Sequence, residues 1–385
     1  MSTSSDQVAT LTGLSAAELP GARELAPRFP LVPNPAPASP AAHGDVMAHL
    51  AFGVAFTDHM ARASWTPDRG WHDKRTDAFG PLTLSPAAAV LHYGQEVFEG
   101  LKAYRHADGS VWTFRPGFNA ARFNASARRL ALPELPEEDF VASLAALVAA
   151  DERWVPAVEG ASLYLRPFMI ATEPFLGVRS AHEIEYLVIA SPVGPYFVHG
   201  FQPVAIWVAQ DYHRVGRGGM GAAKTGGNYA ASLLPQQEAY GKGFEQVCFL
   251  DAATNTQLEE LGGMNMFVVD ADGTVRTPAL TGTILEGGTR AAILQLLRDG
   301  GRTVSEESIA LTEMLAQIRS GQVAETFACG TAAVVTPIGR LAGEGFDVTV
   351  GDGAPGAVTT ELYTALTDIQ YGRRADPHEW MYRLV

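Results

Sequence analysis

Apolar residues recur at helical or strand-like spacing over most of this chain. Phe140, Leu144, Leu147 and Val148 lie on one side of a helix predicted at 137–150. Other helical patterns cover 117–131, 289–298, 312–320 and 357–371. Apolar runs predict strands at 82–85, 111–114, 162–170, 185–193, 203–210, 245–251, 264–278 and 325–338, with a hairpin turn at 270–273.

The order of these elements predicts the fold class and the domains. Strands and helices do not alternate regularly, so we expect an α+β protein with mixed sheets rather than a doubly wound parallel fold. Residues 1–45 contain a proline-rich stretch and read as an extended arm or a partly disordered leader. A first, smaller α/β domain is expected at 46–193 and a larger one at 204–385, joined by a Gly-, Pro- and aromatic-rich connection at 194–203.

Composition narrows the class of partner and the compartment. The formal net charge of −14 argues against a nucleic-acid or anionic-membrane partner. Cys248 and Cys329 are the only two cysteines, so no disulfide framework is expected, as is usual in a reducing cytosol. The N-terminus lacks a signal-peptide pattern, and no apolar run reaches the roughly 18 residues of a membrane span. We therefore expect a soluble cytoplasmic protein, and no metal site is predicted.

The stretch GGMGAAKTGGNY, residues 218–229, places Lys224 among small residues with no acid nearby. Such a lysine is either a phosphate ligand or an amine held out of water for covalent chemistry. The phosphate-loop pattern requires a glycine where this chain has Ala223, which argues against a nucleotide-binding loop. A solvated loop lysine is the remaining alternative.

Two acids and two turns extend the candidate chemistry. Glu259 and Glu260 precede two glycines and a strand, and either carboxylate could pair with a protonated heterocyclic nitrogen, although they could also be solvated turn acids. Gly288 and Thr289 lead into a helix whose free N–H groups could bind an anion, unless the helix is merely capped. The small residues at 328–335 form a second candidate anion turn.

Two arginines and four tyrosines complete the candidates. Arg122 on a helical pattern could bind a phosphate or lie at the surface, whereas Arg166 in the middle of an apolar strand needs a partner. Four phenols lie beside glycine-rich turns, where each is individually more typical of a core: Tyr93, Tyr164, Tyr196 and Tyr229. A pyridoxal phosphate enzyme needs a primary amine, a partner for the ring nitrogen, a phosphate-binding site and a carboxylate-binding turn. This chain offers a candidate for each.

The motifs resemble those of the branched-chain amino acid aminotransferases, which have the two-domain class IV (fold type IV) pyridoxal phosphate fold. The resemblance runs from about residue 52 to 374 and rests on LHYGQEVFEGLKAY, RPGFNAARF, SLYLRPFMIATEPFLGV, SPVGPYF, AAKTGGNYAASL, EELGGMN, ILEGGTR and CGTAAVVTPI, all in the family's order. It implies a cofactor, pyridoxal 5′-phosphate, at the domain interface and a homodimer as the smallest active unit.

The resemblance also implies roles for the cofactor residues. Lys224 would be the Schiff-base lysine and proton shuttle, Glu260 would hold the pyridinium nitrogen protonated, and Tyr229 would bond the 3′-oxygen. The phosphate site would consist of Arg122, Gly288, Thr289 and the turn around Gly330 and Thr331.

For the substrate, the resemblance implies that Tyr93 and the backbone at Thr331 and Ala332 receive the α-carboxylate. Arg166 would meet the γ-carboxylate of glutamate at the pocket mouth. The apolar side-chain pocket would consist of Phe52, Phe98, Tyr164 and Tyr196, with Leu176 and Val178 contributed by a partner subunit.

Two departures from the family pattern limit what is carried over. Many animal members have a redox-active CxxC after the GTA turn, where this chain has Ala333 and Thr336, so no thiol switch is expected. Gly263 replaces the threonine of the family's EVGTMN motif, which removes one hydroxyl contact to the cofactor.

The reaction that the resemblance implies is ping-pong transamination between L-leucine, L-isoleucine or L-valine and 2-oxoglutarate, which yields L-glutamate. The alternatives are a D-amino acid aminotransferase or aminodeoxychorismate lyase of the same fold, or a nucleotide binder resembling a phosphate-loop protein. The aromatic pocket and the EELGGMN context argue against the first two.

Overall fold

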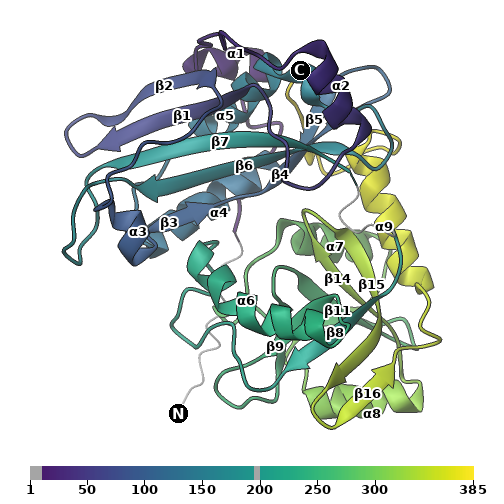
Figure 1. Cartoon of the computed structure of the whole chain (residues 1–385). Helices are drawn as coiled ribbons and strands as arrows, with labels where there is room; N and C mark the ends of the chain where they lie inside the picture. The colour runs from purple at the N-terminus through teal and green to yellow at the C-terminus, as the bar shows by residue number, and fades with distance from the viewer. Residues whose placement is uncertain (1–10, 195–199) are drawn as a thin grey trace. The chain divides into compact units, whose positions relative to one another are not determined.

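The structure, a computed structural model, describes residues 11–194 and 200–385, which form two compact units (Figure 1). The N-terminal unit comprises residues 11–194 together with 223–226 and 368–385. The C-terminal unit comprises residues 200–222 and 227–367. Most of the predicted connection at 194–203 lies outside the described residues.

The N-terminal unit contains one eight-stranded sheet in the order β17-β5-β4-β6-β7-β1-β2, with β3 beside β6. Its pairings are antiparallel. The strands are β1 (His59–Thr66), β2 (Gly70–Ala78), β3 (Glu96–Phe98), β4 (Leu101–Arg105), β5 (Val111–Phe114), β6 (Ser162–Ala171), β7 (Ile184–Val193) and β17 (Met381–Arg383). The helices are α1 (Ala22–Leu25), η1 (Ala26–Arg28), α2 (Pro40–Ala48), α3 (Ala89–Tyr93), α4 (Pro116–Arg129), α5 (Glu137–Ala150) and η2 (Glu152–Trp154).

Helix α5 covers one face of this sheet and forms much of the core of the unit (Figure 1). It contacts β1, β2 and β7, and Phe140, Leu144 and Leu147 are completely buried. Three acids in its first turn complement the positive end of the helix dipole. The predicted helix at 137–150 is therefore confirmed, and its regularly spaced apolar residues are the ones buried in the core.

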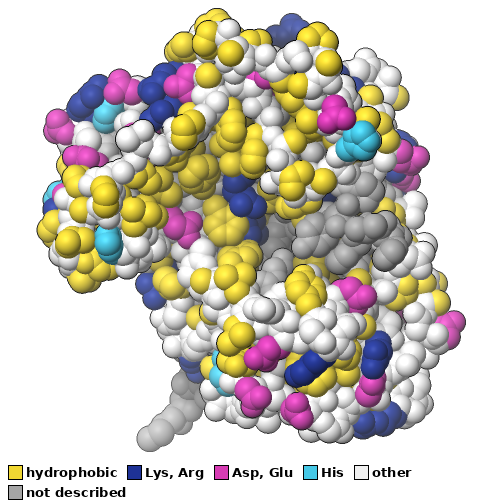
Figure 2. Space-filling model, in the orientation of Figure 1, with side chains coloured by type: hydrophobic (Ala, Val, Ile, Leu, Met, Phe, Trp, Pro, Cys, Tyr) yellow, Lys and Arg dark blue, Asp and Glu magenta, His cyan; other side chains and the backbone are white. Residues whose placement is uncertain are grey.

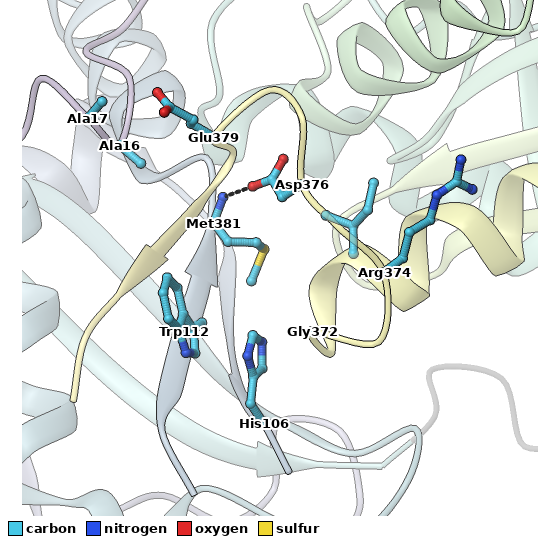
Figure 3. Close-up of a pocket in the computed structure, with 10 residues that line it drawn as sticks. Ala16, Ala17, His106, Trp112, Gly372, Arg374, Asp376, Glu379 and Met381 are labelled. Carbon is cyan, nitrogen blue, oxygen red and sulfur yellow. Dashed lines mark hydrogen bonds between the residues drawn. The ribbon is translucent and has the colours of Figure 1, made fainter. Parts of the chain in front are cut away.

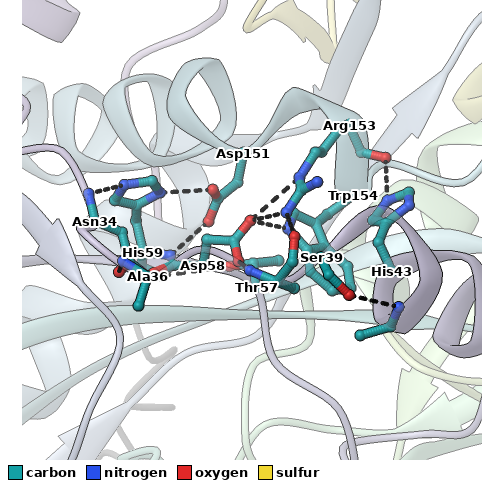
Figure 4. Close-up of polar contacts among 12 residues, drawn as sticks. Asn34, Ala36, Ser39, His43, Thr57, Asp58, His59, Asp151, Arg153 and Trp154 are labelled. Carbon is teal, nitrogen blue, oxygen red and sulfur yellow. Dashed lines mark hydrogen bonds and ion pairs between the residues drawn. The ribbon is translucent and has the colours of Figure 1, made fainter.

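A buried polar network fastens the N-terminal segment to this unit (Figure 4). His59 Nδ1 bonds Asp151 at 2.7 Å, while the Asn34 N–H lies 3.0 Å from His59 Nε2. Asp58 accepts bonds from the Arg153 guanidinium and the indole N–H of Trp154. Since the Asn34 N–H can only donate, Nε2 must accept, so His59 is neutral with its proton on Nδ1.

The C-terminal unit contains a nine-stranded sheet in the order β10-β9-β8-β15-β14-β11-β12-β13, with β16 beside β15. The β8–β9, β8–β15 and β12–β13 pairs are parallel and the others antiparallel, so the sheet is mixed as predicted. The strands are β8 (Val204–Ala209), β9 (Gln246–Leu250), β10 (Leu258–Leu261), β11 (Asn265–Asp270), β12 (Val275–Pro278), β13 (Val304–Glu307), β14 (Val323–Gly330), β15 (Val334–Gly343) and β16 (Phe346–Thr349). The helices are α6 (Gly226–Gly241), α7 (Gly288–Asp299), α8 (Leu311–Ser320) and α9 (Ala357–Gln370).

Helices α7 and α8 pack against β14 in this unit. Helix α8 buries Leu311, Met314, Leu315 and Ile318, which is one face of a 3.6-residue period. The hairpin between β11 and β12 turns through residues 271–274, where Gly273 has a φ of +89°. This confirms the predicted DADG turn.

Some elements differ from the prediction. Residues 82–85 are not a strand; Pro81 and Pro86, which lack a backbone N–H, flank this segment. The arm contains helix α2, which Ser39 caps through the Ala42 N–H. Residues 368–385 belong to the N-terminal unit, where β17 pairs with β5, although we predicted them in the second domain.

Among the described residues, neither the helices nor the cavity beside β17 adds a membrane span or a second grouping of predicted site residues. None of the helices in residues 11–194 and 200–385 is long and apolar enough to cross a membrane. A cavity of about 440 Å³ beside β17 is lined by His106, Trp112, Arg374 and Met381, among others (Figure 3). No residue that we predicted for the site lines this cavity.

Candidate active site

The backbone of Lys224 is fixed on both sides by other segments of the N-terminal unit. Its N–H donates a hydrogen bond of 2.9 Å to Ser126 Oγ on α4, and its carbonyl accepts one of 3.0 Å from the Phe98 N–H on β3. Ser126 and the neighbouring Thr225 are buried. The lysine nitrogen lies 4.6 Å from the centre of the Phe98 ring. Lys224 is thus held against an aromatic ring, which does not fit a freely solvated loop lysine.

Four predicted pocket residues lie together on one side of the same sheet. The Arg166 guanidinium carbon lies 4.8 Å from the centre of the Phe98 ring and 5.3 Å from that of Tyr164. The Tyr164 hydroxyl accepts a hydrogen bond of 3.0 Å from Arg166, and its ring meets Phe52 edge-on at 4.9 Å. Arg166 therefore stabilises its charge over aromatic faces, as cation–π contacts allow.

The two adjacent acids have different partners in the C-terminal unit. Glu260 Oε1 accepts the Leu285 N–H at 2.9 Å and lies 2.9 Å from a guanidinium nitrogen of Arg214. Glu259 instead accepts the Thr283 hydroxyl, and burial raises its pKa although Thr283 and Arg214 oppose the shift. A buried carboxylate with an N–H donor and an arginine satisfies the usual requirement for burying an ionised acid. Glu260 is thus the better candidate for holding a charged ring nitrogen.

The turn at 262–265 brings several predicted cofactor residues together. Asn265 Nδ2 lies 3.4 Å from Glu260 Oε2 and donates a hydrogen bond of 3.0 Å to the Leu285 carbonyl. A Cβ atom on Gly287, the N-cap of α7, would lie only 2.1 Å from Asn265 Oδ1, so a larger residue there would displace the Asn265 side chain. Asn265 thus links the acid to the start of α7, where Gly288 and Thr289 form the first turn.

The same turn also lies beside Tyr229 and the end of β14. A Cβ atom on Gly263 would lie 3.7 Å from the Tyr229 ring, in ordinary van der Waals contact. Gly330 would place its Cβ 3.3 Å from Met264 and 3.5 Å from the Gly263 carbonyl oxygen. Tyr229, Glu260, Gly330 and the N-terminus of α7 are therefore neighbours of one short turn.

The turn that carries Thr331 and Ala332 connects β14 to β15 and ends in an unusual backbone conformation. Val334 has a φ of +61°, which a β-branched residue rarely adopts. Such a conformation costs about 1–3 kcal/mol and tends to occur at functional sites. The turn that we predicted to bind a carboxylate thus ends in an energetically costly backbone conformation.

Helix α7 begins without a side-chain cap, because Gly287 has no side chain that could accept its N–H groups. The helix dipole and the first-turn N–H groups together favour an anion at this end. The Arg290 side chain bonds the Pro278 carbonyl and Glu306 rather than this end of the helix. A phosphate is the kind of group that this terminus suits.

Arg122, the predicted phosphate ligand, has a partner that the sequence did not reveal. Its Nε and one terminal nitrogen each lie 2.7 Å from a different oxygen of Glu99, and both side chains are buried. Glu99 also accepts bonds from Asn119 and from the Gly100 N–H. Two nitrogens of the guanidinium are therefore committed to an ion pair within the N-terminal unit.

The remaining predicted substrate residues form a separate exposed group or are not described. The Tyr93 hydroxyl donates a hydrogen bond to the Leu176 carbonyl, and the exposed fraction of Val178 is 90%. Large exposed side chains at these positions suit a surface that another chain covers. Tyr196 lies outside the described residues.

The sequence alone did not identify Ser126, Glu99, Arg214 or Asn265. Asn265 lies inside the EELGGMN motif and Glu99 inside LHYGQEVFEGLKAY, so the sequence marked both positions as part of the family pattern without indicating what their side chains contact. Ser126 and Arg214 carried none, because their contacts join segments that are distant in sequence.

The comparisons with known proteins identify the family of the chain. The family model described as Amino-transferase class IV matches residues 96–341. A probable branched-chain-amino-acid aminotransferase of Streptomyces coelicolor is 53% identical over 360 residues, which is 93% of this chain and 99% of that protein. The chain belongs to the class IV aminotransferases, in the branched-chain-amino-acid group. The resemblance in the motifs is thereby confirmed.

Solved branched-chain aminotransferases have the same fold as this class IV aminotransferase. The Escherichia coli structure matches with a TM-score of 0.71 and 26% identity, covering 84% of this chain and all of that one (100%). The T.th. enzyme, solved in complex with N-(5′-phosphopyridoxyl)-L-glutamate, matches with a TM-score of 0.66 and 26% identity over 84% of this chain and 99% of that one. The two-domain α+β class predicted from the sequence is therefore confirmed.

Proposed function

We propose that this class IV aminotransferase transfers the amino group between L-leucine, L-isoleucine or L-valine and 2-oxoglutarate, with pyridoxal 5′-phosphate as its cofactor. The observation that carries the proposal is the Phe98 ring, which has a lysine amine at 4.6 Å and a guanidinium at 4.8 Å from its centre. Reactive amine, apolar wall and carboxylate-binding cation are thus grouped around one side chain.

The donor groups of the chain fit the proposed cofactor. A buried carboxylate, Glu260, is already stabilised by Arg214 and the Leu285 N–H, so its charge can remain in place beside a protonated ring nitrogen. The uncapped end of α7 suits the phosphate, and Tyr229 lies beside the turn that links both features. The relative solved in complex with N-(5′-phosphopyridoxyl)-L-glutamate supports pyridoxal phosphate as the cofactor.

When bound, pyridoxal phosphate supplies an aldehyde that reacts with amines and a ring that accepts the electron pair released at the substrate Cα. Lys224 Nζ would take the proton from the substrate Cα and deliver it to C4′ of the cofactor, acting first as general base and then as general acid. Glu260 would keep the ring nitrogen protonated. Ser126 and the Phe98 N–H hold the Lys224 backbone during these transfers.

One pocket must accept an apolar side chain and a carboxylate in alternate half-reactions. Phe52, Phe98 and Tyr164 supply apolar walls, while Arg166 lies against the same rings. Arg166 Nε is buried and has no hydrogen-bond partner among the described residues. The Arg166 side chain is half-buried and forms no ion pair with a described residue, so a γ-carboxylate could pair with its guanidinium, whereas the side chain of leucine would contact only the rings.

We further propose that the active unit is a cytoplasmic homodimer. Large apolar side chains are exposed on and near α3 and in the segment that follows β6, namely Leu91, Tyr93, Leu176 and Val178. Figure 2 shows hydrophobic side chains gathered over the region of α3. A patch of this kind is typical of a protein–protein interface. Light scattering on the purified protein tests this assignment, and a monomer at micromolar concentration would contradict it.

A panel of amino donors with 2-oxoglutarate tests the proposed reaction. Leucine, isoleucine and valine are expected to react, whereas D-alanine and 4-amino-4-deoxychorismate are not. The purified protein should be yellow or become yellow on addition of pyridoxal phosphate. Colourless protein that the cofactor cannot turn yellow would reject the proposal.

A further inference from the structure

Glu96 lies on the same face of the N-terminal sheet as the proposed substrate pocket. Strands β3 and β6 pair so that Glu96 lies opposite Ile170 and Phe98 opposite Phe168. Because side chains alternate along a strand, Arg166 continues the row of Phe168 and Ile170. The residues of this row are half-buried, whereas those between them are buried. The carboxylate and the guanidinium thus share one partly desolvated surface.

The Glu96 carboxylate is held in place by the loop that follows Lys224. Its Oε1 accepts hydrogen bonds from the Gly226 N–H and, at 3.3 Å, from the Thr225 hydroxyl. A Cβ atom on Gly226 would lie 2.5 Å from the same oxygen, so glycine is needed for this close approach. These bonds fix where the negative charge lies. They require only an acceptor oxygen, which an amide side chain also provides.

Arg166 is the basic partner of Glu96 on this face. Its charge favours the ionised form of Glu96, although burial dominates and raises the pKa of that carboxyl group. The guanidinium lies over Phe98 and Tyr164, and the half-buried Arg166 side chain forms no ion pair with a described residue. Arg166 is therefore positioned to bind an additional anion, and an anion bound there lies in the field of Glu96, with which Arg166 interacts electrostatically.

We propose that the charge of Glu96 determines how this pocket divides its affinity between dicarboxylate and apolar substrates, an inference that rests on the proposed function. When an apolar side chain fills the pocket, Glu96 supplies the counter-charge for Arg166. When a γ-carboxylate enters, Glu96 repels it and limits the strength of its binding. Glu96 is thus a specificity-determining residue that keeps Arg166 from making the pocket selective for glutamate.

Glu96→Gln separates the charge from the hydrogen bonds. The amide oxygen can still accept from Gly226 and Thr225, so kcat with leucine should stay within about twofold of the wild type. The KM for 2-oxoglutarate should fall about 3- to 10-fold, because one repulsive charge is removed at moderate effective dielectric constant. The inhibition constant of glutarate, an unreactive dicarboxylate, should fall equally. The KM for leucine and the inhibition constant of 4-methylvalerate should change less than about twofold.

Two further variants keep the inference testable. Glu96→Ala removes both the charge and the acceptor, so it should shift the ratio of the glutarate and 4-methylvalerate inhibition constants in the same direction while also lowering kcat. In an Arg166→Gln background the repulsion by Glu96 remains, so Glu96→Gln should still shift that ratio in the same direction. A purely structural role for Glu96 would lower activity in Glu96→Ala without any change in the ratio.

The outcomes distinguish this inference from the proposed function. If the wild-type holoenzyme does not transaminate leucine, the proposed function fails. If it does so but the inhibitor ratio is unchanged in both Glu96 variants, or if both inhibitors respond equally, only the role of Glu96 is overturned. Thermal unfolding of each variant verifies that the fold is retained.

Discussion

The backbone N–H of Lys224 donates a hydrogen bond of 2.9 Å to Oγ of Ser126, a residue 98 positions earlier in the chain. The carbonyl of the same lysine accepts the N–H of Phe98. Both polar groups of the Lys224 backbone are therefore bound to segments that belong to the N-terminal unit. A base that must take a proton from one carbon and deliver it to another benefits from such restriction, since small misplacements are costly in rate.

Ser126→Ala should destabilise the protein because it leaves the Lys224 N–H without its buried acceptor. The expected loss is about 1–3 kcal/mol in the free energy of unfolding, measured by urea denaturation. The matched control is Ser320→Ala, which removes an exposed hydroxyl at the end of α8 and should cost less than about 0.5 kcal/mol. Equal losses in the two variants would show that the Ser126 bond has no special weight.

Glu260→Gln should retain the cofactor but lower kcat about 10²- to 10⁴-fold, because a neutral amide cannot stabilise a protonated ring nitrogen. Glu259→Gln is the matched control, since the adjacent carboxylate binds Thr283 instead. Its kcat should remain within about tenfold of the wild type. Steady-state kinetics on cofactor-loaded protein measure both, and a larger loss in Glu259→Gln would reverse the assignment.

The two cysteines should be unreactive in the folded protein. Burial raises the pKa of Cys248 to about 12 and likewise that of Cys329 to about 12, so neither forms a thiolate near neutral pH. Titration with Ellman's reagent should detect no thiol in the native protein and both thiols in guanidinium chloride. Activity should be the same before and after mild oxidation, consistent with Ala333 and Thr336 in place of a CxxC pair. A rapidly reacting thiol would contradict this account.

Asp251 should contribute stability that is lost in acid. Burial alone would raise the pKa of Asp251, but hydrogen bonds from the N–H groups of Gln257, Thr254 and Thr256 outweigh it and lower the pKa to about 2. The folded state therefore binds fewer protons than the unfolded state between about pH 4 and pH 2, so stability falls as the pH falls through this window. Asp251→Asn should flatten this part of the stability profile, as followed by urea unfolding. An unchanged slope would exclude the carboxylate as its cause.

The sequence predicted the longest elements that have an apolar face, because burial sets their pattern, but it did not predict strands β1 to β4 or β10. Helix α5 and strands β6 and β7 lie where the pattern of apolar residues placed them, to within one or two residues. Helix α6 escaped prediction for a physical reason. Its buried positions are Asn228, Ser232, Pro235 and Ala239, so its inner face is polar or small, and two glycines open it. Such a helix has no apolar period to detect.

The residues of the candidate site also fall into two groups, those that the sequence indicates and those whose role depends on the fold. Lys224, Glu260 and the glycines before α7 carry local signals, since their chemistry is unusual for their surroundings in the sequence. The Glu99 partner of Arg122 and the Ser126 partner of Lys224 depend on how distant segments pack. Contacts of that kind follow from the fold, which motifs alone do not specify.

The measurement that tests the central claim most directly is the visible spectrum of the holoenzyme during a half-reaction. Adding L-leucine should abolish the yellow band, and subsequent 2-oxoglutarate should restore it, because one site serves both substrates in turn. Lys224→Ala should have neither the band nor measurable transamination, while retaining its fold by circular dichroism. A band that leucine does not change, or a Lys224→Ala variant that cycles like the wild type, would contradict the account.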